Sequence, residues 1–266
     1  MIEIDANFQK KQGEDKSFQY FMNIQGELYR NMNGRKTLRF YLGDEGFFIK
    51  QHFGIGWKEV FKNLSQLKLP VISAKTEYKA INYLHTLNID TMDIVGFSEK
   101  GINPAILKSF LITKELDKTI SLEDYCANWS EKAPSFREKQ LLLIKVANIV
   151  KKMHENGLNH RDLYICHFLL RKSNEEADKD SRLFLIDLHK AQIRENVPER
   201  WLIKDLSALY FSAMHIGLTK RDFLRFVKIY RGQALRDILT MENIFWEKVK
   251  KKADILDAMP ESKKKT

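Results

Sequence analysis

The segment Asn159–Leu170, with the sequence NHRDLYICHFLL, decides the fold of this chain. Apolar side chains recur at helical spacing upstream of it, and Gly157 is a typical residue at which such a helix ends. The segment begins with the polar and charged residues His160, Arg161 and Asp162 and closes with an apolar run. This order predicts a long helix, then a polar loop, then a buried strand.

A β-hairpin is predicted directly after this loop. Phe168–Leu170 and Leu183–Ile186 are short apolar runs that flank the polar stretch Arg171–Asp180. The second run leads to Asp187, which lies 25 residues beyond Asp162. A carboxylate at the end of a buried strand can bind a metal ion, or it can simply cap a turn.

The loop and the hairpin resemble the catalytic and metal-binding loops of protein kinases. The resemblance implies that Asp162, in a motif with His160 and Arg161, orients an acceptor hydroxyl, and that Asp187 holds magnesium on ATP. Such a role suits a carboxylate, because phosphoryl transfer depends mostly on positioning and charge stabilisation. By itself the tripeptide also fits a core histidine followed by an ordinary surface Arg–Asp pair.

The first 50 residues have the pattern of strands and turns. Phe18–Tyr29, Leu38–Leu42 and Phe47–Lys50 are rich in apolar residues, and the turn Gly43–Gly46 joins the last two runs. We expect an antiparallel sheet whose last strand ends at Lys50. A further strand is expected over Ala105–Ile112.

Two helices are predicted after this sheet begins. Trp57–Leu67 is amphipathic, and Glu77, Ile81 and Leu84 share one face of the next helix. In the protein-kinase pattern, Lys50 would contact ATP phosphates and Glu77 would pair with that lysine. A lysine at the end of a strand is more commonly just solvated.

The same resemblance adds further candidate positions and two departures. The hinge-like stretch Thr113–Leu116 makes Glu115 a candidate for cofactor binding. The glycine-rich loop has a single glycine in Asn31–Thr37, so that Arg35 or Lys36 would contact phosphate instead. His167 occupies the position of the second metal ligand, an asparagine in protein kinases, and imidazole is a poor ligand for magnesium. Two-metal coordination and protein-kinase activity are therefore not the natural inference.

The last third of the chain is predicted to be helical. Helices are expected over Asp205–Ile216 and Thr219–Tyr230, the second with a Thr-x-x-Asp cap at Thr219. Asp205 resembles the buried aspartate that braces the catalytic loop in this fold, or it is a carboxylate favoured by the helix dipole. We expect the charged tail from Lys248 to fray.

These elements predict an α+β protein with a two-lobed protein-kinase-like fold. An antiparallel sheet with helices would form an N-terminal ATP-binding lobe over residues 1–115. A mainly helical catalytic lobe would follow over residues 116–266.

A narrower resemblance runs through nearly the whole chain. Four stretches are similar to the bacterial lipopolysaccharide core heptose (I) kinases: Thr119–Cys126, Asn159–Leu170, Ile186–Arg194 and Gly217–Asp222. This family has both departures from protein kinases, including the run Cys-His-Phe-Leu-Leu after the catalytic aspartate. The resemblance implies that the enzyme uses ATP and Mg²⁺ to phosphorylate the first heptose of the lipopolysaccharide inner core at its 4-hydroxyl.

The implied acceptor is a lipid-anchored glycan that carries phosphate and carboxylate groups, on the cytoplasmic face of the inner membrane. The net charge of +10 suits this acceptor, the anionic membrane surface, and acyl carrier protein, an acidic partner linked to similar proteins. Both Trp57–Leu67 and Thr219–Arg231 could face the membrane or a partner, or each could be an ordinary helix with one core face.

Composition sets further limits on the class of protein. With 44% hydrophobic residues the chain can form a core, and its two cysteines, Cys126 and Cys166, indicate neither a disulfide framework nor a zinc site. The first residues lack the apolar run of a secretory signal, and no stretch approaches the roughly 18 apolar residues of a membrane span. We therefore expect an intracellular protein that is not integral to the membrane.

Three other functions remain open on these residues. A 3-deoxy-manno-octulosonic acid kinase would share the catalytic elements and phosphorylate the neighbouring sugar. A non-catalytic kinase-like module would use its basic surface to bind lipid or protein. Nucleic-acid binding would suit the charge, but no recognition motif accompanies it, and we predict no nucleic-acid partner.

Overall fold

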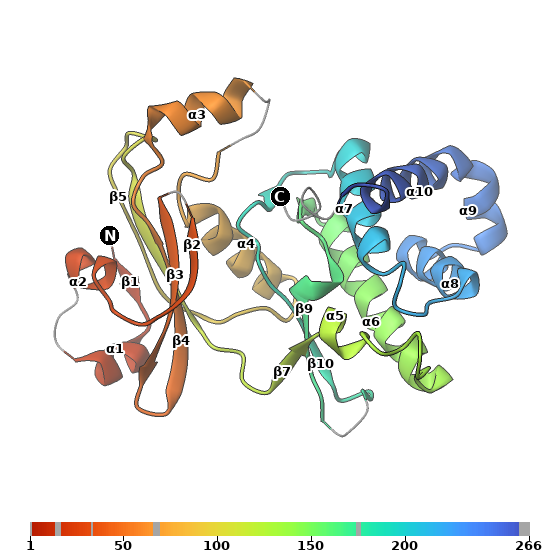
Figure 1. Cartoon of the computed structure of the whole chain (residues 1–266), viewed down its shortest axis with the longest axis horizontal. Helices are drawn as coiled ribbons and strands as arrows, with labels where there is room; N and C mark the ends of the chain where they lie inside the picture. The colour runs from red at the N-terminus through yellow and green to blue at the C-terminus, as the bar shows by residue number, and fades with distance from the viewer. Residues whose placement is uncertain (1, 14–16, 33, 66–69, 174–176, 261–266) are drawn as a thin grey trace. The chain divides into compact units, whose positions relative to one another are not determined.

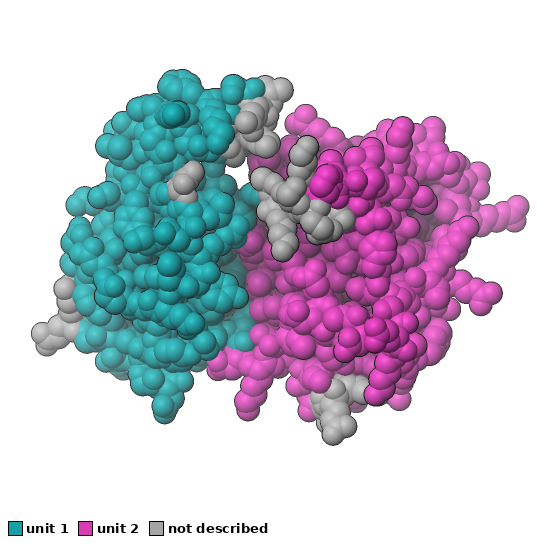
Figure 2. Space-filling model, viewed as in Figure 1, with its two compact units in different colours: residues 1–83, 92–116, 188–190 teal, residues 84–91, 117–187, 191–266 magenta. Residues whose placement is uncertain are grey.

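The protein is described by a computed structural model that covers residues 2–13, 17–32, 34–65, 70–173 and 177–260. The chain forms two compact units (Figure 2). Unit 1 comprises residues 1–83, 92–116 and 188–190, and unit 2 comprises residues 84–91, 117–187 and 191–266. Each unit is described by itself. The predicted division assigns ATP binding to residues 1–115 and catalysis to residues 116–266. It stays a prediction, because the two units are defined by their internal contacts and not by function.

Unit 1 is built on a six-stranded sheet with the strand order β1-β5-β6-β4-β3-β2, in which every neighbouring pair is antiparallel. Its strands are β1 (Glu3–Ile4), β2 (Glu27–Met32), β3 (Arg35–Leu42), β4 (Glu45–His52), β5 (Ile94–Lys100) and β6 (Lys108–Lys114). Its helices are α1 (Ala6–Gln12), α2 (Phe18–Met22), α3 (Gly56–Ser65) and most of α4 (Lys75–Thr86).

The core of unit 1 lies between the sheet and the helices α1 and α2 (Figure 1). More than half of its buried members are phenylalanines: Phe8, Phe21, Met22, Leu38, Phe40, Phe47, Ile49, Phe110 and Ile112. Burial of such large side chains stabilises a domain by about 1.5–3 kcal/mol each. This core holds β4 and β6 in place, and β4 carries the predicted phosphate-binding lysine.

Three boundaries in unit 1 differ from the predicted ones. Phe18–Tyr29 is not one strand, because the Ser17 hydroxyl caps a helix over Phe18–Met22 and only the last residues of the run enter β2. Lys50 does not end β4, since pairing with β6 continues as far as His52. The strand expected over Ala105–Ile112 begins later, because the Asn103 side chain and carbonyl accept hydrogen bonds from the next backbone N–H groups and hold a turn there.

The two helices predicted in unit 1 are confirmed over their described residues. α3 covers the predicted amphipathic segment from Gly56 to Ser65, and the end of that segment lies outside the described residues. α4 contains Glu77, Ile81 and Leu84 on one face, with the three side chains almost completely buried. The periodicity of apolar side chains therefore located both helices correctly.

Unit 2 combines small sheets with helices. Its strands are β7 (Thr119–Ser121), β8 (Leu158–Asn159), β9 (Phe168–Arg171), β10 (Arg182–Leu185) and β11 (Gln192–Ile193). Its helices are α5 (Leu122–Tyr125), α6 (Phe136–Glu155), the 3₁₀ turn η1 (Ile165–His167), α7 (Glu199–Ser212), α8 (Lys220–Arg231), α9 (Leu235–Met241) and α10 (Asn243–Asp257). The predicted hairpin is present as the antiparallel pair β9–β10.

Gly157 ends the long helix α6 in the manner expected. Its φ of +76° lies in the left-handed region, and a Cβ there would be 1.8 Å from the Arg194 carbonyl oxygen. Only glycine permits this approach, through which the Arg194 N–H donates to the Gly157 carbonyl at 2.9 Å. The turn delivers the chain from α6 into β8 and then into the polar loop.

The C-terminal part differs from the prediction at two places. α7 begins at Glu199 rather than Asp205, because Pro198 precedes it with an extended backbone that starts the helix. The chain from Lys248 does not fray at once, since α10 continues to Asp257 and buries Val249 and Ala253. The end of the tail, residues 261–266, lies outside the described residues. The capping box at Thr219 is confirmed, with Asp222 as its reciprocal partner.

Candidate active site

In unit 1, the alternation of β4 side chains places Lys50 on the opposite sheet face from its neighbours. Ile49 and Gln51 face α1 and α2, and the Gln51 amide donates to the Phe21 carbonyl at 2.9 Å. Lys50 therefore faces the other way, and its Nζ lies 2.6 Å from Oε1 of Glu77 on α4. Glu77 is buried, whereas the lysine keeps about a quarter of its side chain exposed. The expected ion pair is thus formed, with the lysine accessible to a ligand.

Positive charge gathers around this ion pair. His52, two residues along the same strand face, has a pKa lowered to about 3, first by burial and then by Arg35, Lys50 and His189. Arg35, a predicted phosphate contact, lies directly opposite His52 in the β3–β4 register. The imidazole is consequently neutral near pH 7, and the positive charges of this corner of unit 1 are those of Arg35 and of Lys50, the latter paired with Glu77.

Glu115, the predicted hinge contact, is engaged within unit 1. Its carboxylate receives both Nε of Arg39 at 3.0 Å and Nη2 at 2.6 Å, a bidentate pair. Its backbone N–H donates to the Gly46 carbonyl at 2.9 Å. These contacts fix where Glu115 sits after β6, while its part in cofactor binding stays a prediction.

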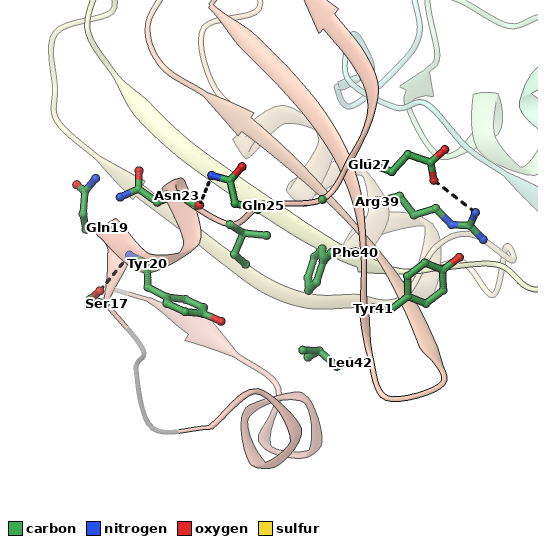
Figure 3. Close-up of a pocket in the computed structure, with 12 residues that line it drawn as sticks. Ser17, Gln19, Tyr20, Asn23, Gln25, Glu27, Arg39, Phe40, Tyr41 and Leu42 are labelled. Carbon is green, nitrogen blue, oxygen red and sulfur yellow. Dashed lines mark hydrogen bonds and ion pairs between the residues drawn. The ribbon is translucent and has the colours of Figure 1, made fainter.

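Arg39 also borders a cavity of about 720 Å³ in unit 1 (Figure 3). The cavity is lined by Ser17, Gln19, Tyr20, the segment 23–27 and the β3 residues 39–42. None of the predicted site residues lines it. Its position between the α2–β2 connection and β3 makes it a feature of the N-terminal fold, and we assign it no catalytic role.

In unit 2, a single carboxylate holds the polar loop in place. Asp205, fully buried in the middle of α7, accepts the backbone N–H of His160 at 2.6 Å and that of Arg161 at 2.7 Å. Arg161 has a φ of +72°, which is unfavourable for a residue with a side chain. The carboxylate therefore stabilises a strained turn, and the brace expected of Asp205 is present. A helix-dipole role does not describe a residue in the middle of the helix.

His160 ties this turn to the segment that leads to Asp187. The ring is completely buried, and its Nε2 donates to the Ile186 carbonyl at 2.9 Å. Burial lowers the pKa of His160, the neighbouring His167 lowers it further, and Asp205 opposes the shift. The neutral ring of His160 thus links the turn to Ile186, the residue before Asp187.

His167 lies between the two predicted acidic residues. Its Nδ1 donates to the backbone carbonyl of Asp162 at 2.7 Å, and its Nε2 lies 3.5 Å from Oδ2 of Asp187. The ring also stacks on His160, with centroids 5.7 Å apart and planes inclined by 15°. Asp187, like Arg161, has a positive φ, here +61°. The loop and the end of β10 therefore bring Asp162, His167 and Asp187 together in unit 2.

The residues around Asp187 fit a divalent cation that takes its remaining ligands from phosphate and water. Because Nδ1 of His167 donates to the Asp162 carbonyl, Nε2 is the ring nitrogen that faces the Asp187 carboxylate, and a cation held there would have a nitrogen and an oxygen ligand. Within the described ranges no group of three or more His, Cys, Asp or Glu side chains forms a ready metal site. Magnesium in phosphoryl-transfer enzymes typically has one or two protein carboxylates and relies on phosphate and water for the rest.

Two supporting contacts are not predicted from the sequence. His154 on α6 lies with Nε2 3.3 Å from Oδ2 of Asp205 and with Nδ1 2.9 Å from the Tyr230 hydroxyl. Its spacing from Val150 on an otherwise apolar helix face was the available signal. Trp201, whose ring lies 4.8 Å from the Arg161 guanidinium carbon, had no signal, because the contact joins segments distant in sequence. Arg161 is therefore not an ordinary surface residue.

Comparison with known proteins identifies the family. The lipopolysaccharide kinase (Kdo/WaaP) family matches residues 19–230. The chain belongs to this family. The match spans the sheet of unit 1 from α2 onward, and unit 2 as far as the end of α8.

Individual members of the family are similar over most of their length. The lipopolysaccharide core heptose(I) kinase WaaP of Escherichia coli (strain K12) is 49% identical over 230 residues, which is 86% of each chain. The enzyme of the same name from Pseudomonas aeruginosa is 48% identical over 82% of each chain. A solved structure of WaaP in complex with acyl carrier protein has a TM-score of 0.82 and 39% identity, covering 96% of this chain and 98% of that one.

Family membership establishes the reaction class and the fold. The protein is a phosphotransferase of the Kdo/WaaP kinase family, and such kinases use ATP, typically with a divalent metal ion. The α+β kinase-like fold expected from the motifs is confirmed by the TM-score of 0.82. The described helices include none long and apolar enough to cross a bilayer.

We predict that Asp205→Asn reduces phosphoryl transfer by disordering the catalytic loop. An amide has one accepting oxygen, so either the His160 or the Arg161 N–H would face an NH₂ group. The buried N–H left unpaired should cost about 1–3 kcal/mol of unfolding free energy. Chemical denaturation and a steady-state kinase assay at a temperature where the variant is folded provide the two measurements.

Asp222→Asn is the matched control for this prediction. Asp222 is also a buried carboxylate of unit 2, where it pairs with Lys139 at 2.8 Å and Arg225 at 2.9 Å and caps α8. This variant should lose comparable stability and keep its kcat, because its partners lie outside the loop. If both variants kept a wild-type kcat, Asp205 would be only a stability determinant.

Proposed function

We propose that the protein phosphorylates the first heptose of the lipopolysaccharide inner core at its 4-hydroxyl, with ATP as donor. The observation that carries this proposal is the loop held by Asp205, which presents Asp162 beside Asp187 in a chain 46–49% identical to three enzymes named as heptose(I) kinases. The acceptor position comes from the family resemblance. The geometry of the loop supports phosphoryl transfer as the reaction, and the relatives support heptose as the acceptor.

Within unit 2, we assign separate roles to the loop residues. Asp162 accepts a hydrogen bond from the acceptor hydroxyl and orients it, which is the contribution that phosphoryl transfer requires of a carboxylate. His160 does not transfer protons, because it is buried and its Nε2 is bonded to Ile186. It positions the loop, as does the backbone of Arg161 through Asp205.

Within unit 1, Lys50 contacts ATP phosphate, and Glu77 holds the lysine in place through the 2.6 Å ion pair. Arg35 adds positive charge where protein kinases have a glycine-rich loop. We retain Glu115 as a cofactor-binding position at the end of β6. Its anchoring by Arg39 favours contact through its backbone over contact through its side chain.

We propose Mg²⁺ as the metal, held by Asp187 with His167 as its neighbour. A divalent ion would neutralise charge on the phosphate oxygens during transfer. Asp187 supplies the oxygen ligand that Mg²⁺ prefers, while the imidazole of His167 would bind later first-row metals better. His167 also orients Asp162 through the carbonyl contact at 2.7 Å, which is independent of metal.

We predict ATP-dependent phosphorylation of core acceptors that contain heptose and none of acceptors that lack it. The assay would incubate the purified protein with labelled ATP, Mg²⁺ and lipopolysaccharide core from strains that differ only in heptose addition. Chelation of divalent ions should abolish transfer, and the product should carry phosphate at the 4-position by mass spectrometry.

The alternatives give different results in the same assay. Transfer to the heptose-less acceptor would assign the protein as a 3-deoxy-manno-octulosonic acid kinase. Absence of transfer to either acceptor, by folded protein that binds lipid or protein, would favour a non-catalytic module. Tight, salt-sensitive binding of nucleic acid would revive the third alternative.

We further propose that α3 brings the protein to the cytoplasmic face of the inner membrane. Trp57 and Phe61 lie one turn apart on this helix, stacked at 5.6 Å, with 49% and 62% of their surfaces exposed. Lys58 and Lys62, both exposed, lie about 100° around the helix from them. Glu59 on the same helix pairs with Lys62 at 3.4 Å and offsets part of this positive charge. Aromatic and basic side chains in this arrangement favour the interface of an anionic bilayer.

We predict that Trp57→Ala combined with Phe61→Ala weakens binding to vesicles containing anionic phospholipid by 10-fold or more. The two rings supply most of the apolar surface that would enter the interface. Phe136→Ala is the matched control, because Phe136 on α6 has a similar exposure of 60%. Vesicle sedimentation measures the binding, and equal binding of the double variant and the control would contradict the role of α3.

We propose acyl carrier protein as a protein partner. Support comes from the solved complex of WaaP with acyl carrier protein and from the net charge of +10, which suits an acidic partner. In unit 2, a groove of about 650 Å³ between α6 and α8 combines Leu143, Ile144 and Ile229 with Arg225 and Lys228. A groove lined by both apolar and basic side chains fits an acidic protein, and this groove is our candidate for the contact.

A further inference from the structure

Three cations surround one indole ring next to the catalytic aspartate. We call Arg161, Arg200, Lys204 and Trp201 the Trp201 cluster. The guanidinium carbons of Arg161 and Arg200 lie 4.8 Å and 5.2 Å from the ring centroid, and the Lys204 ammonium lies 5.7 Å from it. Arg161 directly precedes Asp162, so the cluster begins at the catalytic loop.

The cluster has polar groups that the surrounding protein does not satisfy. Nε of Arg161 and Nε1 of Trp201 are both buried, and neither has a hydrogen-bond partner among the described residues. A buried N–H without an acceptor destabilises the folded protein. Two such donors on adjoining side chains are most simply explained by an acceptor group that binds there.

The charges around the cluster also favour an anion. Arg194 is close enough to Arg161 to repel it, and its own guanidinium donates to Asn159 Oδ1 at 2.5 Å rather than to a carboxylate. Asp162 and Asp205 are the carboxylates that act on Arg161 in the opposite sense. Asp205 already accepts the two backbone N–H groups of the loop. Glu199, at the start of α7, is paired with Lys248 at 2.9 Å.

We propose that the Trp201 cluster binds an anionic group, a carboxylate or a phosphate, on the acceptor saccharide. This inference rests on the proposed function and names the part of the acceptor that the protein recognises. Guanidinium groups bind both kinds of oxyanion through paired N–H donors, and the indole face offsets part of the repulsion between the cations. Because Arg161 and Asp162 are consecutive, an anion held by the cluster fixes the acceptor hydroxyl relative to the catalytic carboxylate.

The test compares Arg200→Gln and Lys204→Gln with the wild type on two acceptors. One is the heptose-containing core acceptor as purified, and the other is the same acceptor after removal of phosphate and reduction of carboxyl groups. Each variant should raise the KM for the charged acceptor about 10-fold, with little change in kcat or in the KM for ATP. With the uncharged acceptor, variants and wild type should have the same, higher KM.

Arg236→Gln on α9 is the control, since it removes an exposed positive charge elsewhere in unit 2. It should leave both acceptor KM values unchanged. Equal KM values for wild type and cluster variants on the charged acceptor would overturn the inference, as would a rise in the KM for ATP alone. Failure of the proposed function is recognised separately, because wild-type protein would then transfer no phosphate to the charged acceptor.

Discussion

The carboxylate of Asp205 is the constraint on which the catalytic part of this structure depends. It accepts two consecutive backbone N–H groups in a completely buried position, and these belong to the residues that precede Asp162. The turn they form includes a positive φ at Arg161, a conformation that a residue with a side chain adopts only when its surroundings compensate. Without this buried acceptor, both N–H groups and the strained turn would favour another loop conformation.

The remaining contacts extend this constraint to Ile186 and Asp187. His160 joins the turn to the carbonyl of Ile186, and His167 joins the carbonyl of Asp162 to the carboxylate of Asp187. Asp187 has its own positive φ, so that both acidic residues are placed by strained backbone held in a hydrogen-bonded network. The two histidines differ in role, because His160 is sealed in the core while His167 borders the acidic pair.

Much of this arrangement was predictable, because each element has a local signal. The apolar period of α6, the hairpin β9–β10 and the order of Lys50, Glu77, Asp162 and Asp187 were visible in the sequence, and the 2.6 Å ion pair follows from the alternation of β4. The failures have physical causes. The sequence predicts a strand where α2 lies, because the short apolar run has no clear period. The Ser17 cap is the only feature that distinguishes this helix from a strand.

Local sequence signals do not predict contacts between segments that are distant in the chain. The only local signal for His154 is its place on an otherwise apolar face of α6, which does not reveal Tyr230 as its partner. The contact between Arg161 and Trp201 has no local signal, since it depends on how the segments pack in unit 2. The identity of the acceptor sugar is inferred differently, from sequence similarity over long stretches and from the names of the relatives. The geometry of the loop constrains the reaction more than the substrate.

The central claim is that Asp162 carries phosphoryl transfer in a loop whose shape does not depend on its side chain. The most direct measurement is the single-turnover rate of phosphate transfer by Asp162→Ala, together with its free energy of unfolding. We expect the rate to fall by about 10²- to 10⁴-fold while the stability stays close to that of the wild type. Transfer at the wild-type rate by this variant would contradict the account.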